Sequence, residues 1–565
     1  MQYYWFLILN ILISSMLCAQ NQSWAEKTLT TMSLREKIGQ LFMVATCANL
    51  HMHEETIAKA ILESPYLMNH DYIEKLIKEY HIGGLIFLYK QNINQQIMLT
   101  NLFQKISTIP LLIGQDAEWG LGMRLYDGIS FPRNMTLGAI QDESLIYDLG
   151  YEIGRQCKKI GVHINFAPVI DINTNPENPI IHMRSFGDDK KRVAQYGILL
   201  MQGMQDAGIL ACGKHFTGHG NTYTDSHAKL PLVLQTREEL YENEFYPFKQ
   251  LINAGIAAIM TAHLKIPALD STPYLPSSLS YPIVTDLLKK ELGFSGLVVT
   301  DGMGMKGITK YHKPGYAEFK AFLAGADIIL CPLDVPKTVA LIEQAIEDKV
   351  ISEEELNQRV LKILKAKERM NVHTSRFVDN KNTLVINTFY AHQLKQALFN
   401  NATSVVTDEQ NLIPLASKKY DDSVLIQIGG TIPSEFEKIL KSAMNIPSFH
   451  ISTDMPQQTI DYVMQKINNK KTIIIALLGM NQNIKTNFGI HEKTHQFIND
   501  LKNKGKKIII TIFGSPYSLR LFEKENILLL AYENDPEAQR TAAHVILGNQ
   551  QALGKLPVNT KFFWD

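Results

Sequence analysis

Residues 257–301 read AAIMTAHLKIPALDSTPYLPSSLSYPIVTDLLKKELGFSGLVVTD, and the folding pattern of the chain is clearest in them. The two ends of this stretch, Ala257–Thr261 and Leu297–Thr300, are short apolar runs typical of buried parallel strands. The segment between them predicts a helical connection, so the stretch is one strand–helix–strand unit. Shortly after each run comes an ionisable residue, His263 and Asp301 respectively.

The same unit recurs on both sides of this stretch. Six further runs of the buried-strand type are Leu41–Thr46, Gly84–Leu88, Leu111–Gln115, Val162–Phe166, Ala211–His215 and Asp327–Leu330. Helical stretches separate the runs, and two of these begin with capping boxes, Ser33–Glu36 and Thr236–Glu239. Eight strand-then-helix units predict an α/β chain with an N-terminal (β/α)8 TIM barrel, with an open doubly wound sheet as the alternative.

A second alternation of strands and helices follows the barrel. A helix from Ser352 to about Met370 is expected to end the first domain, and residues 371–382 are polar and irregular, which predicts a linker. Further strands are expected at Val424–Ile428, Thr472–Leu478, Lys507–Phe513 and Ile527–Ala531, before a helix at Asp535–Leu547. We therefore predict a barrel domain at 20–370 and a C-terminal α/β sandwich domain with a mostly parallel sheet at 383–565.

The N-terminus predicts export. Tyr3–Ala19 is almost wholly apolar, and no acidic residue precedes Glu26. This apolar stretch is short for a bilayer span and suits a signal peptide at residues 1–19, cleaved after Ala19. We expect a periplasmic protein whose mature form does not enter the membrane. The alternatives are an uncleaved anchor and a lipid on Cys18 that associates the protein with the outer membrane.

Composition excludes several classes of protein. The 56 basic residues balance the 56 acidic ones, so the formal charge is zero and no nucleic-acid partner is expected. The apolar share of 45% is that of a folded globular protein and disfavours disorder. The five cysteines at 18, 47, 157, 212 and 331 form no Cys-x-x-Cys pair, so we interpret those of the mature chain as buried free thiols.

Polar residues concentrate where the predicted strands end. Five of the eight strands lead to such residues: Asp116, Asp171, Lys214 with His215, His263 and Asp301. Because catalysis in this kind of barrel sits at the carboxyl ends of the strands, these residues predict a polar pocket. No role is assigned to Asp171 or His263. His215 and His219 have metal-ligand spacing, but Gly218 and Gly220 would break the helix, so no metal and no cofactor are expected.

Several motifs together resemble one enzyme family. The segment Lys214-His215-Phe216-Thr217-Gly218-His219-Gly220, followed by Asp225-Ser226-His227 and Leu230-Pro231, resembles the signature of bacterial β-N-acetylglucosaminidases of glycoside hydrolase family 3. The resemblance covers nearly the whole mature chain. It extends to Met32–Leu41, Asp116–Gly120 with Arg124, Arg184–Gly187, Thr300–Met305, Asn411–Leu415 and Gly554–Pro557.

The resemblance implies a catalytic machinery. Asp301 matches the family nucleophile, which forms a covalent glycosyl–enzyme intermediate. His227 matches the general acid/base, and Asp225 matches the residue that orients its imidazole and stabilises the charge on it. The positions that bind the hydroxyls and carbonyl of the terminal N-acetylglucosamine match Asp116, Arg124, Arg184, Lys214 and His215.

These residues imply a retaining, exo-acting β-N-acetylglucosaminidase, with a carbohydrate as its partner. An N-acetylglucosamine-containing glycan or muropeptide is the expected substrate, in keeping with a role in peptidoglycan turnover. A β-glucosidase or a phosphorylase of the same family remains an alternative. A non-catalytic cell-wall sugar-binding protein is the other alternative, although it would be expected to lack Asp301 or the Asp225–His227 pair.

Overall fold

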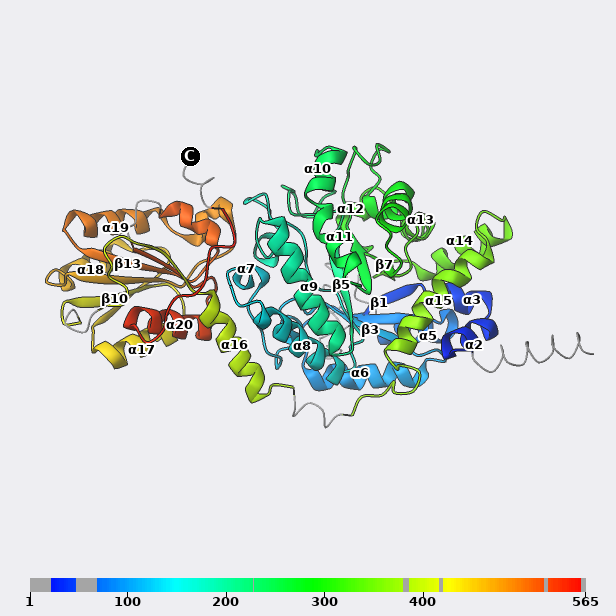
Figure 1. Ribbon diagram of the computed structural model, residues 1–565, viewed down its shortest axis with the longest axis horizontal. Helices are drawn as coiled ribbons and strands as arrows, with labels where there is room; N and C mark the ends of the chain where they lie inside the picture. The colour runs from blue at the N-terminus through cyan, green and yellow to red at the C-terminus, as the bar shows by residue number, and fades with distance from the viewer. Residues whose placement is uncertain are drawn as a thin grey trace, which may run out of the picture.

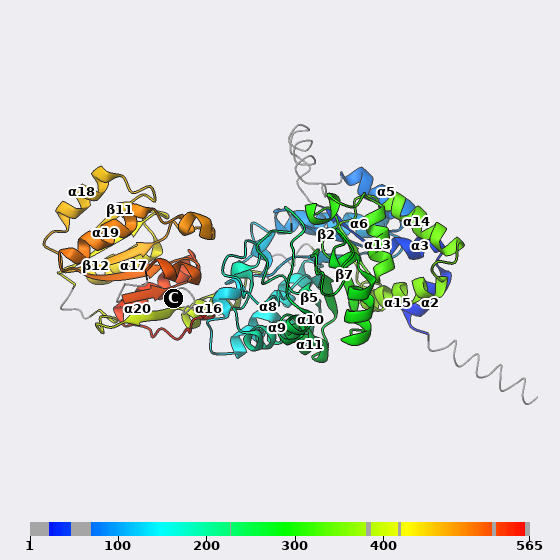
Figure 2. The ribbon, with the colours of Figure 1, turned by 90° about the horizontal axis from the view of Figure 1, so that it is seen from above.

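The computed structural model describes residues 22–46, 69–226, 228–379, 386–415, 420–522 and 527–559. Two α/β units lie side by side along the long axis of the molecule, and α16 (Phe389–Ala402) runs between them (Figure 1). The view from above shows the same separation (Figure 2). The larger unit contains the eight-stranded sheet, and the smaller one contains a six-stranded sheet.

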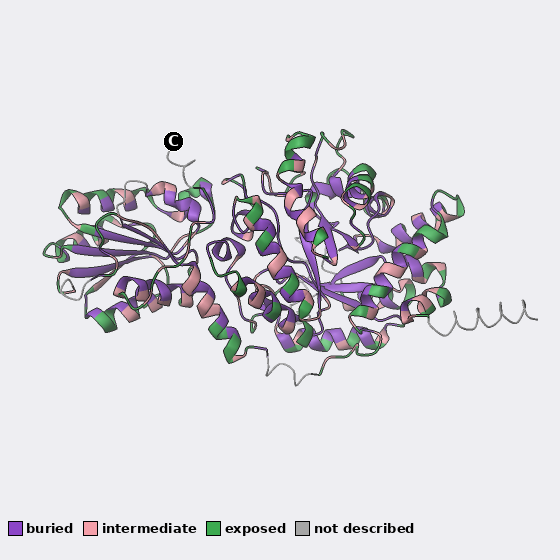
Figure 3. Ribbon diagram, viewed as in Figure 1, coloured by how far each residue is buried: buried purple, intermediate pink, exposed green. Residues whose placement is uncertain are grey.

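The larger unit is the predicted TIM barrel. Its neighbouring strands are parallel and follow chain order, and an isolated bridge joins Val299 of β7 to Ile328, the residue before β8. The strands are buried, while the surrounding helices expose one face (Figure 3). The strands are β1 (Phe42–Thr46), β2 (Gly84–Phe87), β3 (Leu112–Gln115), β4 (Ile164–Asn165), β5 (Leu210–Phe216), β6 (Ala258–Thr261), β7 (Leu297–Thr300) and β8 (Ile329–Leu330).

Helices cover the outside of this barrel. Both predicted capping boxes are present, because Ser33 and Thr236 each accept a hydrogen bond from the backbone of the glutamate three residues on. The helices described here are α2 (Trp24–Thr31), α3 (Leu34–Gly39), α5 (His70–Tyr80), α6 (Ile93–Ile106), α7 (Asn134–Leu137), α8 (Ser144–Lys159), α9 (Lys190–Asp206), α10 (Arg237–Glu242), α11 (Phe245–Asn253), α12 (Lys306–Thr309), α13 (Tyr316–Ala324), α14 (Val335–Glu347) and α15 (Glu353–Arg369). Short helical turns are η1 (Leu121–Met123), η2 (His182–Arg184) and η3 (Ser277–Leu279), with the longer π-helix η4 at Pro282–Glu291.

The smaller unit is the predicted α/β sandwich. Its sheet has the order β11-β10-β12-β13-β14-β9, in which only the β14–β9 pair is antiparallel among the described strands. The strands are β9 (Ser404–Asp408), β10 (Ser423–Ile428), β11 (Ser448–Ile451), β12 (Thr472–Leu477), β13 (Lys507–Ile512) and β14 (Ile527–Leu530). The helices are α17 (Glu435–Met444), α18 (Gln457–Lys466), η7 (Ile484–Gly489), α19 (Glu492–Asn503), η8 (Pro516–Leu521) and α20 (Pro536–Leu547).

The two edge strands, β9 and β11, are absent from the sequence-based prediction. Both are partly exposed, in contrast to the fully buried β10 and β12. An edge strand with one side in solvent carries polar residues and lacks the continuous apolar run that indicates a buried parallel strand. The pattern therefore detects the centre of this sheet and misses its edges.

Some predictions fall on residues that the structure does not describe. The predicted signal peptide at residues 1–19 and the thiols of Cys18 and Cys47 lie outside the described ranges. The predicted domain limits stay predictions, although the two sheets fall on either side of residues 371–382. Cys157, Cys212 and Cys331 are buried free thiols, as predicted. No helix in the described ranges has the length and apolar character needed to cross a bilayer.

Lys367 on α15 is a buried lysine. Its burial predicts a pH-dependent effect on stability that can be measured. Its side chain is fully buried, and its ammonium donates to Gln40 Oε1 at 2.5 Å without a carboxylate partner among the described residues. Burial lowers the pKa of Lys367 to about 7. Because the unfolded chain binds this proton more tightly, Lys367 costs stability at pH 7, and the cost disappears as the pH rises toward the ordinary lysine pKa.

We expect Lys367→Met to be more stable than the wild type at pH 7, with a difference that shrinks by up to about 1.4 kcal/mol per pH unit up to pH 10. Urea unfolding of both proteins at each pH measures this difference. Lys365→Met is the control, because Lys365 lies on the same helix with its side chain 54% exposed. A difference for Lys367→Met that stays constant with pH would show that the ammonium is charged in the folded protein throughout.

Candidate active site

A pocket of about 450 Å³ opens at the carboxyl ends of the barrel strands. Its volume lies in the range of small-molecule sites. Six of the eight predicted site residues line it: Asp116, Arg124, Arg184, Lys214, His215 and Asp301. Asp225 lies on the loop after β5 but does not line this pocket, and His227 is outside the described residues. All residues that line the pocket lie between Ile86 and Cys331 and so belong to the barrel.

Two acidic residues follow β3 and enter this pocket. Asp116 and Glu118 are separated by one residue, Ala117, which is buried. Asp116 accepts hydrogen bonds from Arg124 and Lys214, both at 2.8 Å. Burial alone would raise the pKa of Asp116, but these two cations outweigh it and lower the pKa to about 2. Asp116 is therefore ionised at neutral pH.

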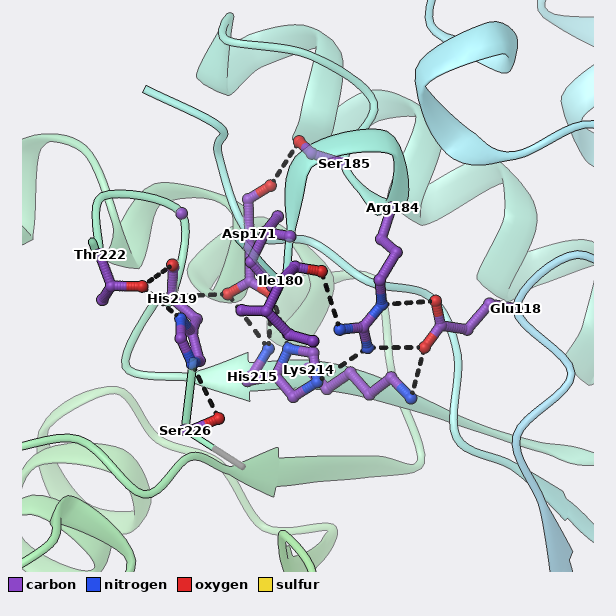
Figure 4. Close-up of polar contacts among 12 residues, drawn as sticks. Glu118, Asp171, Ile180, Arg184, Ser185, Lys214, His215, His219, Thr222 and Ser226 are labelled. Atoms are coloured by element: carbon purple, nitrogen blue, oxygen red, sulfur yellow. Dashed lines mark hydrogen bonds and ion pairs between the residues drawn. The ribbon is translucent and has the colours of Figure 1, made fainter. Parts of the chain in front are cut away.

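Glu118 was not among the predicted site residues, and the structure places it at the centre of the charge network. Its oxygens lie 2.8 and 2.9 Å from Arg184 nitrogens and 2.9 Å from Lys214 Nζ (Figure 4). Burial opposes ionisation, yet Arg184 and Lys214 hold the pKa of Glu118 well below its usual range. The available sequence signal was the Asp-x-Glu spacing after β3, which points both side chains the same way in extended chain.

Lys214 and His215 are neighbours in the chain and both line the pocket. Successive side chains of a regular strand point to opposite faces. Here the pairing of β5 with β6 shifts register between Gly213 and Phe216, which interrupts the regular alternation around these two residues. Lys214 thereby contacts the carboxylates of Asp116 and Glu118. His215 Nε2 lies 3.3 Å from Arg184.

Asp171, at the rim after β4, orients the His215 ring through a hydrogen bond to Nδ1. Its carboxylate accepts a hydrogen bond from His215 Nδ1 at 2.6 Å and one from the His219 backbone at 2.7 Å. Burial alone would raise the pKa of Asp171, but the neighbouring histidine and the hydrogen bonds to it lower the pKa. Because Asp171 accepts from Nδ1, the Nε2 atom of His215 is the one presented to the pocket.

Asp301 follows β7 directly. Its backbone N–H donates to the Thr261 carbonyl at 2.9 Å, and its Oδ1 accepts from the Gly302 N–H at 2.8 Å. His263, which had no predicted role, donates from Nε2 to the Gly302 carbonyl at 3.1 Å and accepts from Ser278 at Nδ1. His263 therefore holds the backbone beside Asp301, while the Asp301 carboxylate faces the pocket.

The charges that line the pocket balance. Asp116, Glu118 and Asp301 provide three carboxylates, and Arg124, Arg184 and Lys214 provide three cations. Such a lining suits a neutral ligand rich in hydroxyl and amide groups, which hydrogen-bonds to charged groups without adding net charge. Among the described residues no group of three or more histidine, cysteine or acidic side chains is placed to hold a metal ion.

The second domain supports the turn that carries Arg184. Met183, at the middle of η2, packs in a buried cluster with Ile484, Phe488 and Tyr517. The ring of His182 lies 5.1 Å from that of Tyr517, and the Tyr517 hydroxyl accepts from Asn173 at 2.6 Å. Arg184 thus reaches the pocket from a turn that is packed between the two domains.

Glu118→Gln tests how much the ion pairs of Glu118 with Arg184 and Lys214 contribute to stability. We expect the free energy of unfolding to fall by about 3 kcal/mol, because Arg184 and Lys214 would lose their shared buried counter-charge. Urea unfolding measures the loss. The control is Glu353→Gln, whose carboxylate pairs with Lys37 at 2.8 Å but is 54% exposed, and which should cost less than about 1 kcal/mol. Equal losses in the two variants would contradict the central place of Glu118.

Comparison with known proteins shows the family of the chain. Residues 33–366 match the family model described as the glycosyl hydrolase family 3 N terminal domain. Beta-hexosaminidase A of Pseudoalteromonas piscicida is 34% identical over 329 residues, which cover 53% of this chain and 55% of that protein. The chain thus spans about half the length of this relative. A beta-N-acetylglucosaminidase/beta-glucosidase of Cellulomonas fimi is 26% identical over 420 residues, or 72% of this chain and 71% of that protein.

A solved structure extends the likeness to both domains. The glycoside hydrolase family 3 beta-N-acetylglucosaminidase from Paenibacillus sp. str. FPU-7 superposes with a TM-score of 0.77 at 29% identity. The alignment covers 94% of this chain and 99% of that one. The resemblance inferred from the motifs is confirmed: the chain belongs to glycosyl hydrolase family 3.

Proposed function

We propose that the protein is a retaining, exo-acting β-N-acetylglucosaminidase that hydrolyses terminal, non-reducing β-linked N-acetylhexosamine. The observation that carries the proposal is the pocket in which Asp301 lies together with Asp116, Arg124, Lys214 and Arg184. The names of the hexosaminidase relatives and of the Paenibacillus structure support the choice of an N-acetylated sugar.

The proposed reaction has two steps. The Asp301 carboxylate attacks the anomeric carbon while His227 donates a proton to the glycosidic oxygen, so the aglycone leaves as an alcohol. His227 then takes a proton from water, and the resulting hydroxide displaces Asp301 from the sugar with overall retention of configuration. Asp225 orients the imidazole and stabilises its charged form, which is present before the first step and again after the second.

The charged pocket residues position the sugar in this scheme. Asp116 and Glu118 are ionised, so they accept hydrogen bonds from sugar hydroxyls, while Lys214 and Arg184 donate to hydroxyl and carbonyl oxygens. Arg124 lines the same pocket and donates to Asp116, which holds that carboxylate in place. Such fixed contacts orient the anomeric carbon toward Asp301.

We also propose that the protein is exported and acts in peptidoglycan turnover. The apolar stretch Tyr3–Ala19 supports export, and N-acetylglucosamine is part of the glycan that a periplasmic enzyme meets. Fractionation of cells that produce the full chain tests this proposal. Retention of the protein in the cytoplasm with residues 1–19 intact would contradict it.

A panel of p-nitrophenyl β-glycosides, assayed with and without phosphate, tests the activity. We expect the N-acetylglucosaminide to be cleaved at least about 10-fold faster than the glucoside, because the pocket offers partners for the acetamide group. Phosphate should not change the rate, and the β-anomer of the free sugar should appear first. Preference for the glucoside would favour the β-glucosidase alternative, and formation of sugar 1-phosphate would favour the phosphorylase.

A further inference from the structure

Ser226 stands between Asp225 and His227 in the sequence, and a buried histidine contacts its side chain. Ser226 and His219 are each 2% exposed, and Ser226 Oγ lies 3.0 Å from His219 Nε2 (Figure 4). The Ser226 carbonyl also accepts the Gly307 N–H at 3.3 Å, so α12 packs against the same point of the loop. The loop after β5 is therefore anchored at the residue next to Asp225.

The direction of each hydrogen bond around His219 follows from its partners. Thr222 Oγ1 donates to the His219 carbonyl at 3.0 Å, so it accepts from His219 Nδ1 at 2.7 Å. His219 Nδ1 therefore carries the proton, and Nε2 accepts from the Ser226 hydroxyl. Burial lowers the pKa of His219 to about 4, which keeps the ring neutral and this arrangement intact at neutral pH.

His219 is also joined to the wall of the pocket. Its backbone N–H donates to Asp171 Oδ1 at 2.7 Å, while Asp171 Oδ2 accepts from the His215 ring at 2.6 Å (Figure 4). Asn178 Nδ2 donates to the His219 carbonyl at 2.8 Å and holds the turn from the other side. A continuous set of buried hydrogen bonds thus connects His215, which lines the pocket, with Ser226 on the loop.

We propose that His219 is a positioning residue for the acid/base step: its ring, through Ser226, sets the place of the Asp225–Ser226 segment relative to the sugar-binding residues. The inference rests on the proposed function, in which His227 supplies and receives the proton and Asp225 orients its imidazole. A displacement of about 1 Å in a catalytic group can cost about 100-fold in rate, whereas the loss of one neutral hydrogen bond costs only about 1 kcal/mol of stability. The two effects are separable by experiment.

Ser226→Ala removes the hydroxyl that donates to His219 Nε2 and leaves the His219 ring in place. We expect kcat/KM to fall at least about 10-fold for a glycoside with a poor leaving group, such as the disaccharide of N-acetylglucosamine, and less than about 3-fold for a dinitrophenyl glycoside. Labelling of Asp301 by a fluorinated substrate should be retained. The matched control is Ser518→Ala, which removes a buried hydroxyl that donates to the Ser515 carbonyl at 2.7 Å in the second domain and should change neither rate.

His219→Leu provides a second variant, and the double variant with Ser226→Ala completes a cycle. If both residues act through one hydrogen bond, the double variant should be no slower than His219→Leu alone. The positioning role would be overturned if Ser226→Ala left kcat/KM unchanged, or if kcat/KM fell equally for good and poor leaving groups. His227→Ala is measured in parallel: if that variant shows no dependence on the leaving group, the proposed acid has failed, which is a different result from the failure of His219.

Discussion

Asp301→Asn should lower kcat/KM on an aryl N-acetylglucosaminide by at least about 10³-fold, which corresponds to about 4 kcal/mol of activation free energy. The amide keeps the size of the side chain and can still accept from the Gly302 N–H, but it loses the charge that attacks the anomeric carbon. Steady-state kinetics measure the loss, and mass spectrometry of the wild type after treatment with a fluorinated substrate should locate the label on Asp301.

The control for this experiment is Asp270→Asn. Asp270 lies on the loop after β6 and accepts from Ser280, but it does not line the pocket. We expect it to change kcat/KM by less than about 3-fold. A label on any carboxylate other than Asp301, or a comparable loss in both variants, would show that the nucleophile has been assigned to the wrong residue.

His227→Ala should produce the second large effect, and its size should depend on the leaving group. A poor leaving group needs a proton as the bond breaks, so its rate should fall by about 10²- to 10⁴-fold. An activated aryl group leaves without protonation, so its first step should survive and the glycosyl–enzyme intermediate should accumulate. The slope of log(kcat/KM) against leaving-group pKa, measured for wild type and variant, tests this directly.

Asp225→Asn should change the same slope in the same direction, but less, because it alters only the orientation and charge of the imidazole. The carboxylate of Glu437, which lies 2.7 Å from His450 in the second domain, offers a matched control, since Glu437→Gln changes another histidine–carboxylate pair. Equal losses across the leaving-group series in His227→Ala would make His227 a binding or structural residue, and the search for the acid would have to turn to the second domain.

The barrel could be predicted because each of its strands is recognisable from a short local run of apolar residues. Each strand between Phe42 and Leu330 is buried on both faces, so it appears as an apolar run that needs no knowledge of its neighbours. Parallel strands place their carboxyl ends at one rim, and this rule alone predicts that Asp116, Lys214 and Asp301 lie close together. The family motifs added Arg124 and Arg184, which lie on turns that periodicity does not locate.

Glu118, which the sequence analysis missed, and Asp171, to which it assigned no role, depend on distances across the fold. Glu118 gains its place by meeting Arg184, which is 66 residues away, and Asp171 gains its own by meeting His215, 44 residues on. No local pattern encodes those pairs, because they form only when loops from different strands converge. The same holds for β9 and β11, whose pairing at the edges of the sheet compensates for weak apolar runs.

The sequence by itself thus determined the order of strands and helices, the rim at which polar residues gather and the family motifs. Burial and periodicity are properties of neighbouring residues, so the chain shows them directly. Only the tertiary structure decided that β5 loses register between Gly213 and Phe216, that the second domain packs against Met183, and that His219 contacts Ser226. These features arise when segments far apart in the chain exclude water together, and the free energy that selects them is shared among all of the segments in contact.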